Sequence, residues 1–513
     1  MTIVRSSGIL LPIASLPSPY GIGDFGPGAY RFADFLQATG QRLWQMLPLT
    51  PITAGNPSPY TSSSAFAGNT YLLSPDLLQE LGLLSHKDLA NTPSFPQEAV
   101  SYETALAYKD SLFAAIPEAF QRYQDATLHN GFESFCRQNT SWLQDFALYR
   151  ACEQEFKTSW DHWPEDIRIH DPTAIGRLQE RLKARVTAEK LLQFLFAMQW
   201  RQLKRYCNDR DILLFGDLPY FVDYYSADVW AHPRMFKLSA EKKPTVVSGV
   251  PPDYFSATGQ LWNTPVYDWK NKEAISWWLS RLHHTAGLYD IIRLDHFRGF
   301  AKYWEIPALA PTAVKGVWQP GPGAPLFDQL FRDIPSIRLI VEDLGIVTPD
   351  VNELRQRFRL PGMKILQFAF TSDPTQDPYL PVNHERHSVV YTGTHDNNTI
   401  RGWFEEDIDA SVRQRINDYT AQNVTIDAVH WVFIRLAFSS VADMAIIPMQ
   451  DLLGLGSSCR MNAPSRSTGN WRWRLTSAQL TSELQRILLL ITQTYGRAPP
   501  THPLKNTSEK TST

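Results

Sequence analysis

The sequence has no excess of either charge. Lys and Arg number 49 and Asp and Glu 52, which leaves a formal net charge of −3 over 513 residues. A protein that binds nucleic acid mainly through phosphate contacts needs a basic surplus, and so does one held at an anionic membrane surface. The composition therefore predicts neither partner. Glycine (27) and proline (36) are at ordinary levels, which excludes collagenous and low-complexity chains.

Cysteine is scarce. The four cysteines are scattered, without a CxxC pair or any other spacing typical of metal ligands. A chain of this length buries a core large enough to fold without disulfides or a structural metal. We therefore expect free, buried thiols at Cys136, Cys152, Cys207 and Cys459.

Long apolar runs are also missing. No segment approaches the roughly 18 apolar residues of a membrane-spanning helix. The apolar stretch at 9–13 is interrupted by Pro12 and is shorter than the roughly 7–15 residues of a secretory signal. These absences predict a cytoplasmic protein with no membrane partner.

What the sequence does contain is a series of short apolar runs, several of which end in acidic or polar residues and most of which are separated by helical patterns. Near-continuous apolar strands are typical of a parallel sheet covered on both faces. Eight such strands with intervening helices predict an α/β fold of the (β/α)8 TIM-barrel type. The predicted strands are 8–13, 43–48, 212–217, 289–295, 339–343, 363–368, 389–396 and 444–451.

The spacing of these strands is uneven, which predicts insertions around the carboxyl-terminal face of the barrel. The gap between the second and third strands is far too long for one crossover helix, and most of it has a helical pattern. We expect one catalytic barrel over 1–513, with a mainly helical insertion at about 70–205. A second insertion at about 224–270 lacks a helical period and is predicted to be an ordered loop over the mouth. The polar tail at about 500–513 is expected to fray.

Carboxylates follow four of the predicted strands: Asp217, Asp295, Glu342 and Asp396. In a parallel barrel the carboxyl ends of the strands surround the reaction site. One such acid could simply cap the next helix, but four converging acids indicate either a divalent metal or glycosidic chemistry. No HxH, HExxH or DxDxD spacing accompanies them, so metal binding is the weaker interpretation and no metal or cofactor is predicted.

The neighbours of two acids suggest different roles. Arg293 and Asp295 lie on the same face of their strand, so the guanidinium can keep Asp295 ionised, as a nucleophile requires. Glu342 follows an apolar strand, and desolvation there is expected to raise its pKa, as a proton donor requires.

Several longer motifs carry a resemblance to a known family. In order along the chain they are SPYTSSSAFAGN (58–69), GDLPYFV (216–222), GVPPDYFSATGQLWNTPVYDW (249–269), RLDHFRGF (293–300), VEDLG (341–345), GTHDN (393–397), QDLLGLG (450–456) and NAPSRSTGNWRWR (462–474). By these motifs the sequence resembles the 4-alpha-glucanotransferases (amylomaltases, or disproportionating enzymes) of glycoside hydrolase family 77. The resemblance extends from about residue 8 to 475.

The resemblance implies a role for each matching residue. Asp295 corresponds to the nucleophile, Glu342 to the general acid/base and Asp396 to a carboxylate that holds the distorted donor sugar. The implied substrate-binding residues are Tyr60, an aromatic platform; Asp217, Arg293 and His395, which contact sugar hydroxyls; Trp262, a stacking residue in a lid; and His296, which supports the nucleophile strand. Tyr102 corresponds to a position in a second glucan groove on the helical insertion.

The implied reaction is transfer of 4-alpha-glucan segments between alpha-1,4-glucans, with glucose as a further acceptor, by a retaining mechanism. Two alternatives stay open: an alpha-glucan hydrolase with the same site, and a glucan-binding protein without catalysis, which the three catalytic-type acids disfavour. A monomer is the default expectation. The sequence departs from the family pattern at Asn263 and Thr264, where Gly-Asn is expected, and just before Ser226, where an Asp is expected.

Two motifs are interpreted as decoys. Residues 21–26 match GxGxxG, but Pro17 and Pro19 precede them and no acid follows about 20 residues on, so a turn before a helix is favoured over a dinucleotide site. His283 and His284 are predicted to be a pair on a helix surface rather than ligands.

Overall fold

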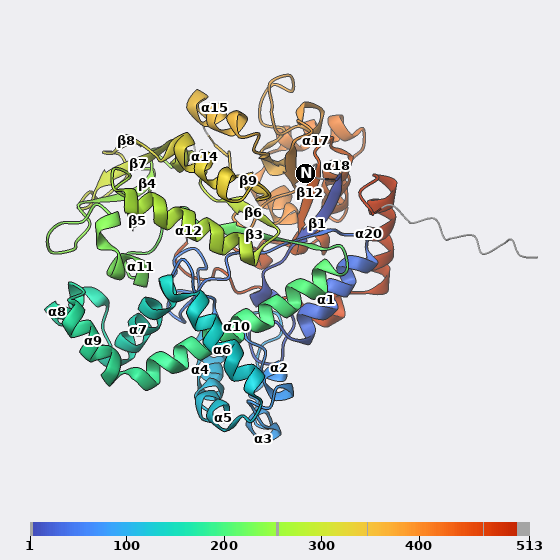
Figure 1. Ribbon diagram of the computed structural model, residues 1–513. Helices are drawn as coiled ribbons and strands as arrows, with labels where there is room; N and C mark the ends of the chain where they lie inside the picture. Colours follow the sequence, from blue (N-terminus) through green and yellow to red (C-terminus); the bar gives the residue numbers. More distant parts are fainter. Residues whose placement is uncertain (1–3, 253–255, 346, 465, 500–513) are drawn as a thin grey trace, which may run out of the picture.

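In the computed structural model, which describes residues 4–252, 256–345, 347–464 and 466–499, a parallel eight-stranded sheet forms the centre of the molecule (Figure 1). The tail at 500–513 and residues 253–255 of the second predicted insertion lie outside the described residues. The order of the strands is β10-β11-β12-β1-β2-β3-β6-β9. Their bounds are β1 Ser6–Leu10, β2 Leu43–Gln45, β3 Leu213–Leu218, β6 Ile291–Leu294, β9 Leu339–Val341, β10 Gly362–Ile365, β11 Ser388–Tyr391 and β12 Met444–Pro448.

The two end strands of this sheet also meet. The backbone N–H of Val341, at the end of β9, donates to the carbonyl of Pro361, just before β10, at 2.9 Å. With helices around the closed sheet, this is a (β/α)8 barrel, as predicted. All eight predicted strands are present, and the first begins two residues earlier than expected, at Ser6. The strands are buried on both faces, which is why each reads as a nearly unbroken apolar run.

Helices cover the outside of the barrel, and most connections between successive barrel strands contain a helix just before the next strand (Figure 1). Those outside the insertions are α1 Pro27–Ala38, α12 Lys272–Leu288, α14 Gly323–Asp333, α15 Pro349–Arg357, α17 Ala410–Thr420, α18 Val429–Ser439 and α20 Ser482–Thr494, with the short α13 Arg298–Ala301, α16 Ile400–Gly402 and α19 Met449–Leu452. The GxGxxG segment forms the turn before α1, and the element directly before it is a 3-10 turn, Ile13–Ser15, rather than a strand, as expected for a decoy.

The long connection between β2 and β3 is helical and forms the lower part of the molecule in Figure 1. Its helices are α2 Pro75–Glu80, α3 His86–Leu89, α4 Tyr102–Phe113, α5 Ile116–Arg122, α6 Ala126–Gln138, α7 Thr140–Phe156, α8 Glu165–Arg168, α9 Pro172–Arg181 and α10 Lys183–Asn208. A buried lysine joins it to the barrel. Lys109 of α4 donates to the carbonyls of Tyr71 and Leu73, each at 2.8 Å, and lies 3.5 Å from Asp24.

A second, antiparallel sheet stands beside the barrel, where the sequence predicted only a loop at 224–270. Its order is β5-β4-β7-β8, and the strands are β4 Val246–Val250, β5 Gln260–Pro265, β7 Lys302–Pro307 and β8 Val317–Pro320. The region also contains α11, Ala227–Ala231. The loop prediction was wrong because β4 and β5 are short strands that pair with each other, and β4 also pairs with β7, which follows the barrel strand β6 in sequence. Such pairing is non-local and leaves no strong local pattern.

Asn263 in β5 explains one departure from the family pattern. Its φ is 60°, in the left-handed region that glycine adopts freely. Asparagine tolerates this region better than most residues, so it can replace the expected glycine without changing the course of the strand.

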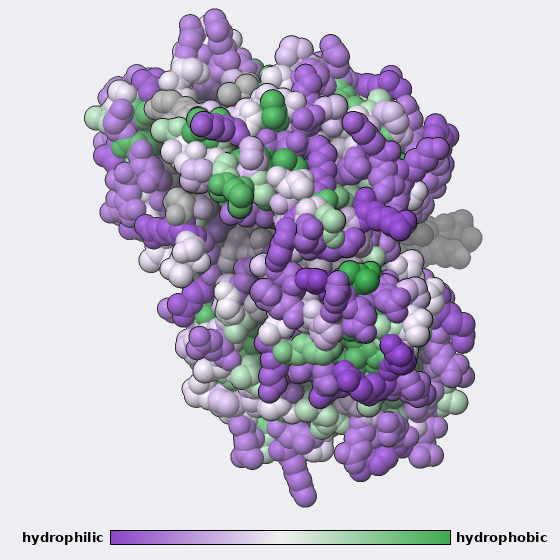
Figure 2. Space-filling model, turned by 90° about the vertical axis from the view of Figure 1, so that its left-hand side faces the viewer, coloured by the Kyte–Doolittle hydropathy of each residue, from purple (hydrophilic) through white to green (hydrophobic). Residues whose placement is uncertain are grey.

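The surface seen in Figure 2 is mostly hydrophilic, with small hydrophobic patches scattered over it. Among the described residues, none of the helices combines the length and apolar character needed to cross a membrane.

Candidate active site

Three neighbouring strands of the barrel bring the first group of predicted residues together. In the parallel pairing of β3 with β6, Asp217 lies opposite Arg293, and in the pairing of β6 with β9, Leu294 lies opposite Val341. Asp295 and Glu342 are the next residues after these last two, so their carboxyls emerge side by side at the same end of the barrel. The strand register therefore explains why residues more than forty positions apart in sequence meet here.

Arg293 lies at the centre of this group and contacts all three acids. Its Nη1 lies 2.7 and 2.6 Å from the two carboxylate oxygens of Asp217 and 3.0 Å from Oδ1 of Asp295. Its Nη2 lies 3.1 Å from Oε2 of Glu342. The Arg293 side chain is 2% exposed, whereas those of Asp295 and Glu342 are 25% and 23% exposed. A buried guanidinium thus fixes two carboxyls that a ligand can still reach.

The pKa shifts of Asp295 and Glu342 differ from those predicted from the sequence. Burial raises the pKa of Asp295, and the neighbouring Glu342 adds to the rise although Arg293 opposes it. Burial also disfavours ionised Glu342, but Arg293 and the backbone N–H of His296, which donates to Oε2 at 2.7 Å, lower its pKa below the usual value. The predicted directions of the two pKa shifts were wrong because Arg293 contacts Glu342 and Asp217 as well as Asp295. Protonation of this coupled pair is therefore favoured at Asp295 and disfavoured at Glu342.

Asp396 is held from a different direction, by residues that follow β12. The Asn462 side-chain amide donates to its Oδ1 at 2.6 Å, and His395 Nε2 lies 3.3 Å from Oδ2. Arg460 donates to the backbone carbonyl of Asp396. Burial opposes ionisation here, but His395 and the bond from Asn462 keep the pKa of Asp396 well below its usual range. Asp396 is therefore ionised at neutral pH.

Tyr60, the predicted platform, lies between the Asp217–Arg293 pair and His395. Its hydroxyl donates to Asp217 Oδ2 at 2.8 Å, and its ring stacks on His395 with centroids 5.1 Å apart and planes 15° apart. Trp471 supports both rings from behind, at 5.7 Å from Tyr60 and 6.0 Å from His395. Tyr60 is thus in contact with the Asp217–Arg293 pair through its hydroxyl and with His395, which neighbours Asp396, through its ring.

Trp262 and His296 lie together at the rim of the site. The Trp262 ring meets the His296 ring edge-on, with centroids 4.9 Å apart. Trp262 also lines a groove of about 890 Å³ between the segment around residue 58, the start of α4 and the 462–472 segment. Asn462, which holds Asp396, lines the same groove. The groove therefore reaches the residue that holds Asp396.

Tyr102 lies at the start of α4, next to the segment that carries Trp471. It is 8% exposed, its hydroxyl donates to the Trp471 carbonyl at 2.6 Å, and it lines the same groove as Trp262. Tyr102 thus packs against the segment that carries Trp471, and the second glucan groove at this residue stays a prediction.

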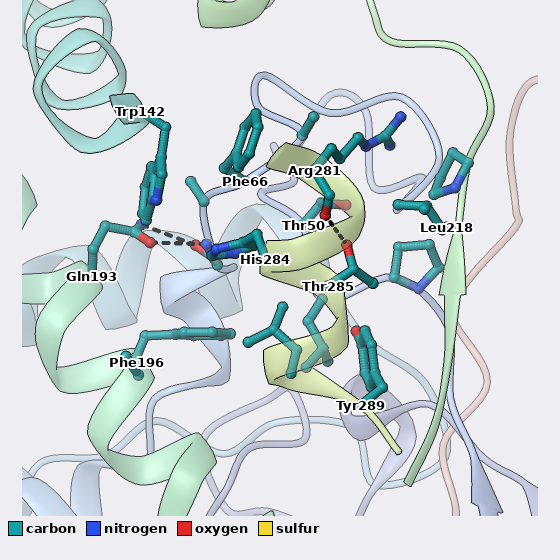
Figure 3. A pocket seen from close by; sticks show the side chains of 18 of the residues that line it. Thr50, Phe66, Trp142, Gln193, Phe196, Leu218, Arg281, His284, Thr285 and Tyr289 are labelled. Atoms are coloured by element: carbon teal, nitrogen blue, oxygen red, sulfur yellow. Dashed lines mark hydrogen bonds between the residues drawn. The ribbon is translucent and has the colours of Figure 1, made fainter. Parts of the chain in front are cut away.

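A small cavity of about 50 Å³ lies behind β3, between α12 and the insertion helices α7 and α10 (Figure 3). His284 projects into this region from α12 and packs against Trp142 and Phe66, with ring centroids 5.6 and 5.5 Å apart. Burial lowers its pKa to about 4, so the ring is neutral at pH 7. The prediction of a surface pair thus holds for exposed His283 and is wrong for His284, because the insertion covers that side of α12.

Among the residues that the structure describes, no cluster of His, Cys, Asp and Glu side chains could hold a metal ion. The cysteines at 136, 152, 207 and 459 are free thiols, two of them buried and two partly buried.

Comparison with known proteins decides the family. The sequence profile of the glycoside hydrolase family 77, described as 4-alpha-glucanotransferase, matches residues 11–481. This chain belongs to the 4-alpha-glucanotransferase family. The 4-alpha-glucanotransferase of Synechocystis is 45% identical over 499 residues, which cover 96% of this chain and 98% of that protein. The potato chloroplastic/amyloplastic 4-alpha-glucanotransferase is 43% identical over 507 residues, covering 96% and 86%.

A solved structure agrees with this membership. The amylomaltase of Streptococcus agalactiae, determined in complex with acarbose, superposes with a TM-score of 0.92 at 35% identity and covers 96% of this chain and 100% of its own. The activity of this chain is accordingly 4-alpha-glucan transfer.

The site of this glucanotransferase contains three residues to which the sequence gave no role: Arg460, Asn462 and Trp471. Two of them lie in the NAPSRSTGNWRWR segment, which carries part of the family resemblance. That resemblance could have drawn attention to the segment, but only the fold shows that it returns to Asp396 and Tyr60.

Proposed function

We propose that the enzyme transfers 4-alpha-glucan segments by retaining double displacement. The Asp295 carboxylate attacks the anomeric carbon of the donor while Glu342 gives a proton to the departing glycosidic oxygen, so the glucan is held as an ester on Asp295. Glu342, now a carboxylate, then takes the proton from the 4-hydroxyl of an acceptor glucan. The acceptor oxygen attacks the anomeric carbon, and the ester bond breaks.

The observation that carries this proposal is the pair of reactive carboxyls on one buried guanidinium. Retaining enzymes keep their two carboxyls about 5–5.5 Å apart, too close for an intervening water. Contact with the two ends of Arg293 holds Asp295 and Glu342 close together, and both are partly exposed. Before attack, Glu342 must carry the proton of the pair, so that Asp295 is ionised as the nucleophile and Glu342 is neutral as the proton donor.

The remaining predicted residues bind sugar in this proposal. Asp396, kept ionised by His395 and Asn462, accepts hydrogen bonds from hydroxyls of the donor sugar, while Tyr60 lies beneath that sugar. Asp217 and His395 complete its surroundings. Trp262 stacks on an acceptor in the groove of about 890 Å³, a volume typical of ligand sites.

We propose alpha-1,4-glucans as donors and acceptors and glucose as a further acceptor. The Streptococcus agalactiae amylomaltase, a protein of the same family, binds acarbose. We further propose one catalytic unit over 1–513 that acts as a monomer in the cytoplasm, with no nucleic-acid partner. The near-neutral charge supports the last point.

Incubation of the protein with maltotriose, followed by separation of the products by chain length, tests the function. Transfer gives both shorter and longer glucans, whereas glucose and maltose without longer products would identify the hydrolase alternative. Asp295→Asn should abolish transfer and hydrolysis together. Activity within about tenfold of the wild type would overturn the assignment, since a lost nucleophile costs far more.

A further inference from the structure

His296 has an unusual backbone for a residue with a large side chain. Its φ is 48°, in the left-handed region that residues other than glycine, asparagine and aspartate seldom adopt. This turn immediately follows Asp295 and directs the His296 N–H toward Glu342, where it donates to Oε2 at 2.7 Å. One residue thus follows the nucleophile in sequence and holds the acid/base in space.

The His296 ring packs against rigid residues on one side, which form a fixed wall, and against the less constrained Trp262 on the other. Behind it are Tyr220, which is 1% exposed and donates to the Gly299 carbonyl at 2.8 Å, and Gly299 itself. A methyl group added at Gly299 would lie 3.1 Å from His296 Cδ2, so the space between Gly299 and the His296 ring is fully occupied. In front is Trp262, 4.9 Å away and perpendicular to the ring.

Trp262 is the less constrained of the two walls. It lies on β5, an edge strand of the second sheet, and its ring is partly exposed to the groove. Its indole N–H donates to the Gln260 side chain of the same strand at 3.2 Å. A sugar that stacks on Trp262 therefore also determines how firmly the His296 ring is held.

The link between His296 and Glu342 depends on position rather than on charge. The Nε2 atom of His296 is buried without a hydrogen-bond partner among the described residues, and burial lowers the ring pKa to about 4. The ring is neutral at pH 7. The groups that face Glu342 are Arg293 and Asp295 from β6 and His296 itself, while Arg298 and Glu342 face the His296 ring.

We propose that His296 is a positioning residue that couples acceptor stacking on Trp262 to the placement of the Glu342 carboxyl. An acceptor sugar on Trp262 fixes the His296 ring, and the left-handed turn passes this constraint to the N–H that holds Glu342. Water cannot stack on Trp262, so it meets a less well-placed base than a sugar does. The inference rests on the proposed roles of Trp262 and Glu342 and adds the connection between them.

His296→Gly tests the coupling, because glycine accepts the left-handed backbone and keeps the N–H but removes the ring. With maltotriose as donor, kcat should fall roughly 10–100-fold, since general acid/base catalysis contributes about 10²–10⁴. With maltotriosyl fluoride, whose leaving group needs no proton, the first-turnover burst of fluoride should stay within about threefold of the wild type. An equal loss on both donors would overturn the proposal by showing a general structural role.

A double-mutant cycle tests whether Trp262 acts through His296. Trp262→Ala and His296→Gly should each lower the rate of transfer. The double variant should be no slower than the less active of the two single variants, which corresponds to a coupling of about tenfold between the two sites. Independent losses that multiply would overturn the proposal. His296→Asn, which also tolerates the left-handed backbone, should behave like His296→Gly. The control is His387→Gly, at a side chain that is 54% exposed, and it should match the wild type.

Glu342→Gln separates this inference from the proposed function. If Glu342→Gln transfers glucan from maltotriose as fast as the wild type, the proposed role of Glu342 fails, and the coupling fails with it. If Glu342→Gln abolishes that transfer while Trp262 and His296 act independently, only the coupling fails.

Discussion

The side-chain amide of Asn462 donates to the Asp396 carboxylate at 2.6 Å, although the two residues are 66 positions apart. They reach each other because the segments after β11 and β12, which are neighbours in the barrel, turn toward the same point. The backbone N–H of Asn462 also donates to the His395 carbonyl at 3.0 Å. One residue therefore fixes both the carboxylate and the turn that carries it.

Asn462→Ala should lower kcat/KM for maltotriose roughly 10–100-fold, because hydrogen bonds to a charged group contribute about 1.5–3 kcal/mol. Asn462→Asp should be worse, since it places a second carboxylate against Asp396. Initial rates of transfer with purified variants measure both effects. A loss below about threefold for Asn462→Ala would show that Asp396 does not depend on this bond.

Arg293→Lys should reduce transfer by at least about 10³-fold, although the charge is kept. A single ammonium cannot reach Asp217, Asp295 and Glu342 with the geometry of the planar guanidinium. The matched control is Arg210→Lys on the surface, where Arg210 stacks on Tyr206 and pairs with Asp34. If both variants keep near wild-type rates, the central role of Arg293 is wrong.

Asp451 makes stability depend on pH. Its carboxyl is 2% exposed, accepts bonds from Thr392 and from the Ile400 N–H, and has a pKa raised by burial to about 6. The unfolded value is about 3.9, so the native state binds the extra proton between pH 4 and 6. This contribution is present below that window and is lost as the pH rises through it, by about 3 kcal/mol in all.

Asp451→Asn removes this titration. Between pH 4 and 7 the free energy of unfolding of the wild type should therefore fall by about 3 kcal/mol relative to the variant. Denaturant unfolding of both proteins at pH 4, 5, 6 and 7 measures the difference. A difference that stays constant over this range would contradict the raised pKa.

Arg497→Ala should destabilise the protein by about 3–5 kcal/mol without touching the site, because it removes the several charge-assisted hydrogen bonds that a buried guanidinium donates. Arg497 is fully buried, and its guanidinium donates to the carbonyls of Ser6, Ala437, Phe438, Ser440 and Ala442. Arg486→Ala on α20, at a side chain 67% exposed, should cost under about 1 kcal/mol. Equal midpoints in chemical denaturation for the two variants would refute this.

The predicted barrel and the three acids at its mouth came from local signals. Each barrel strand is buried on both faces, so it has to be apolar along its whole length, and this pattern survives in the sequence. The acids at 217, 295 and 342 stand where these runs end. No such signal exists for β4 and β5, which are short, and the pairing of β4 with β7 depends on residues distant in sequence.

The sequence by itself determined the barrel, its long helical insertion, the family and the carboxyl groups that we propose as the catalytic ones. Only the tertiary structure decided the directions in which the pKa values of Asp295 and Glu342 shift, because Arg293 is shared among three acids and the His296 N–H favours ionised Glu342. It also brought Asn462 to Asp396 and Trp471 behind Tyr60. Charge coupling, hydrogen bonding and stacking act over a few ångströms between segments, and the order of residues along the chain does not state those distances.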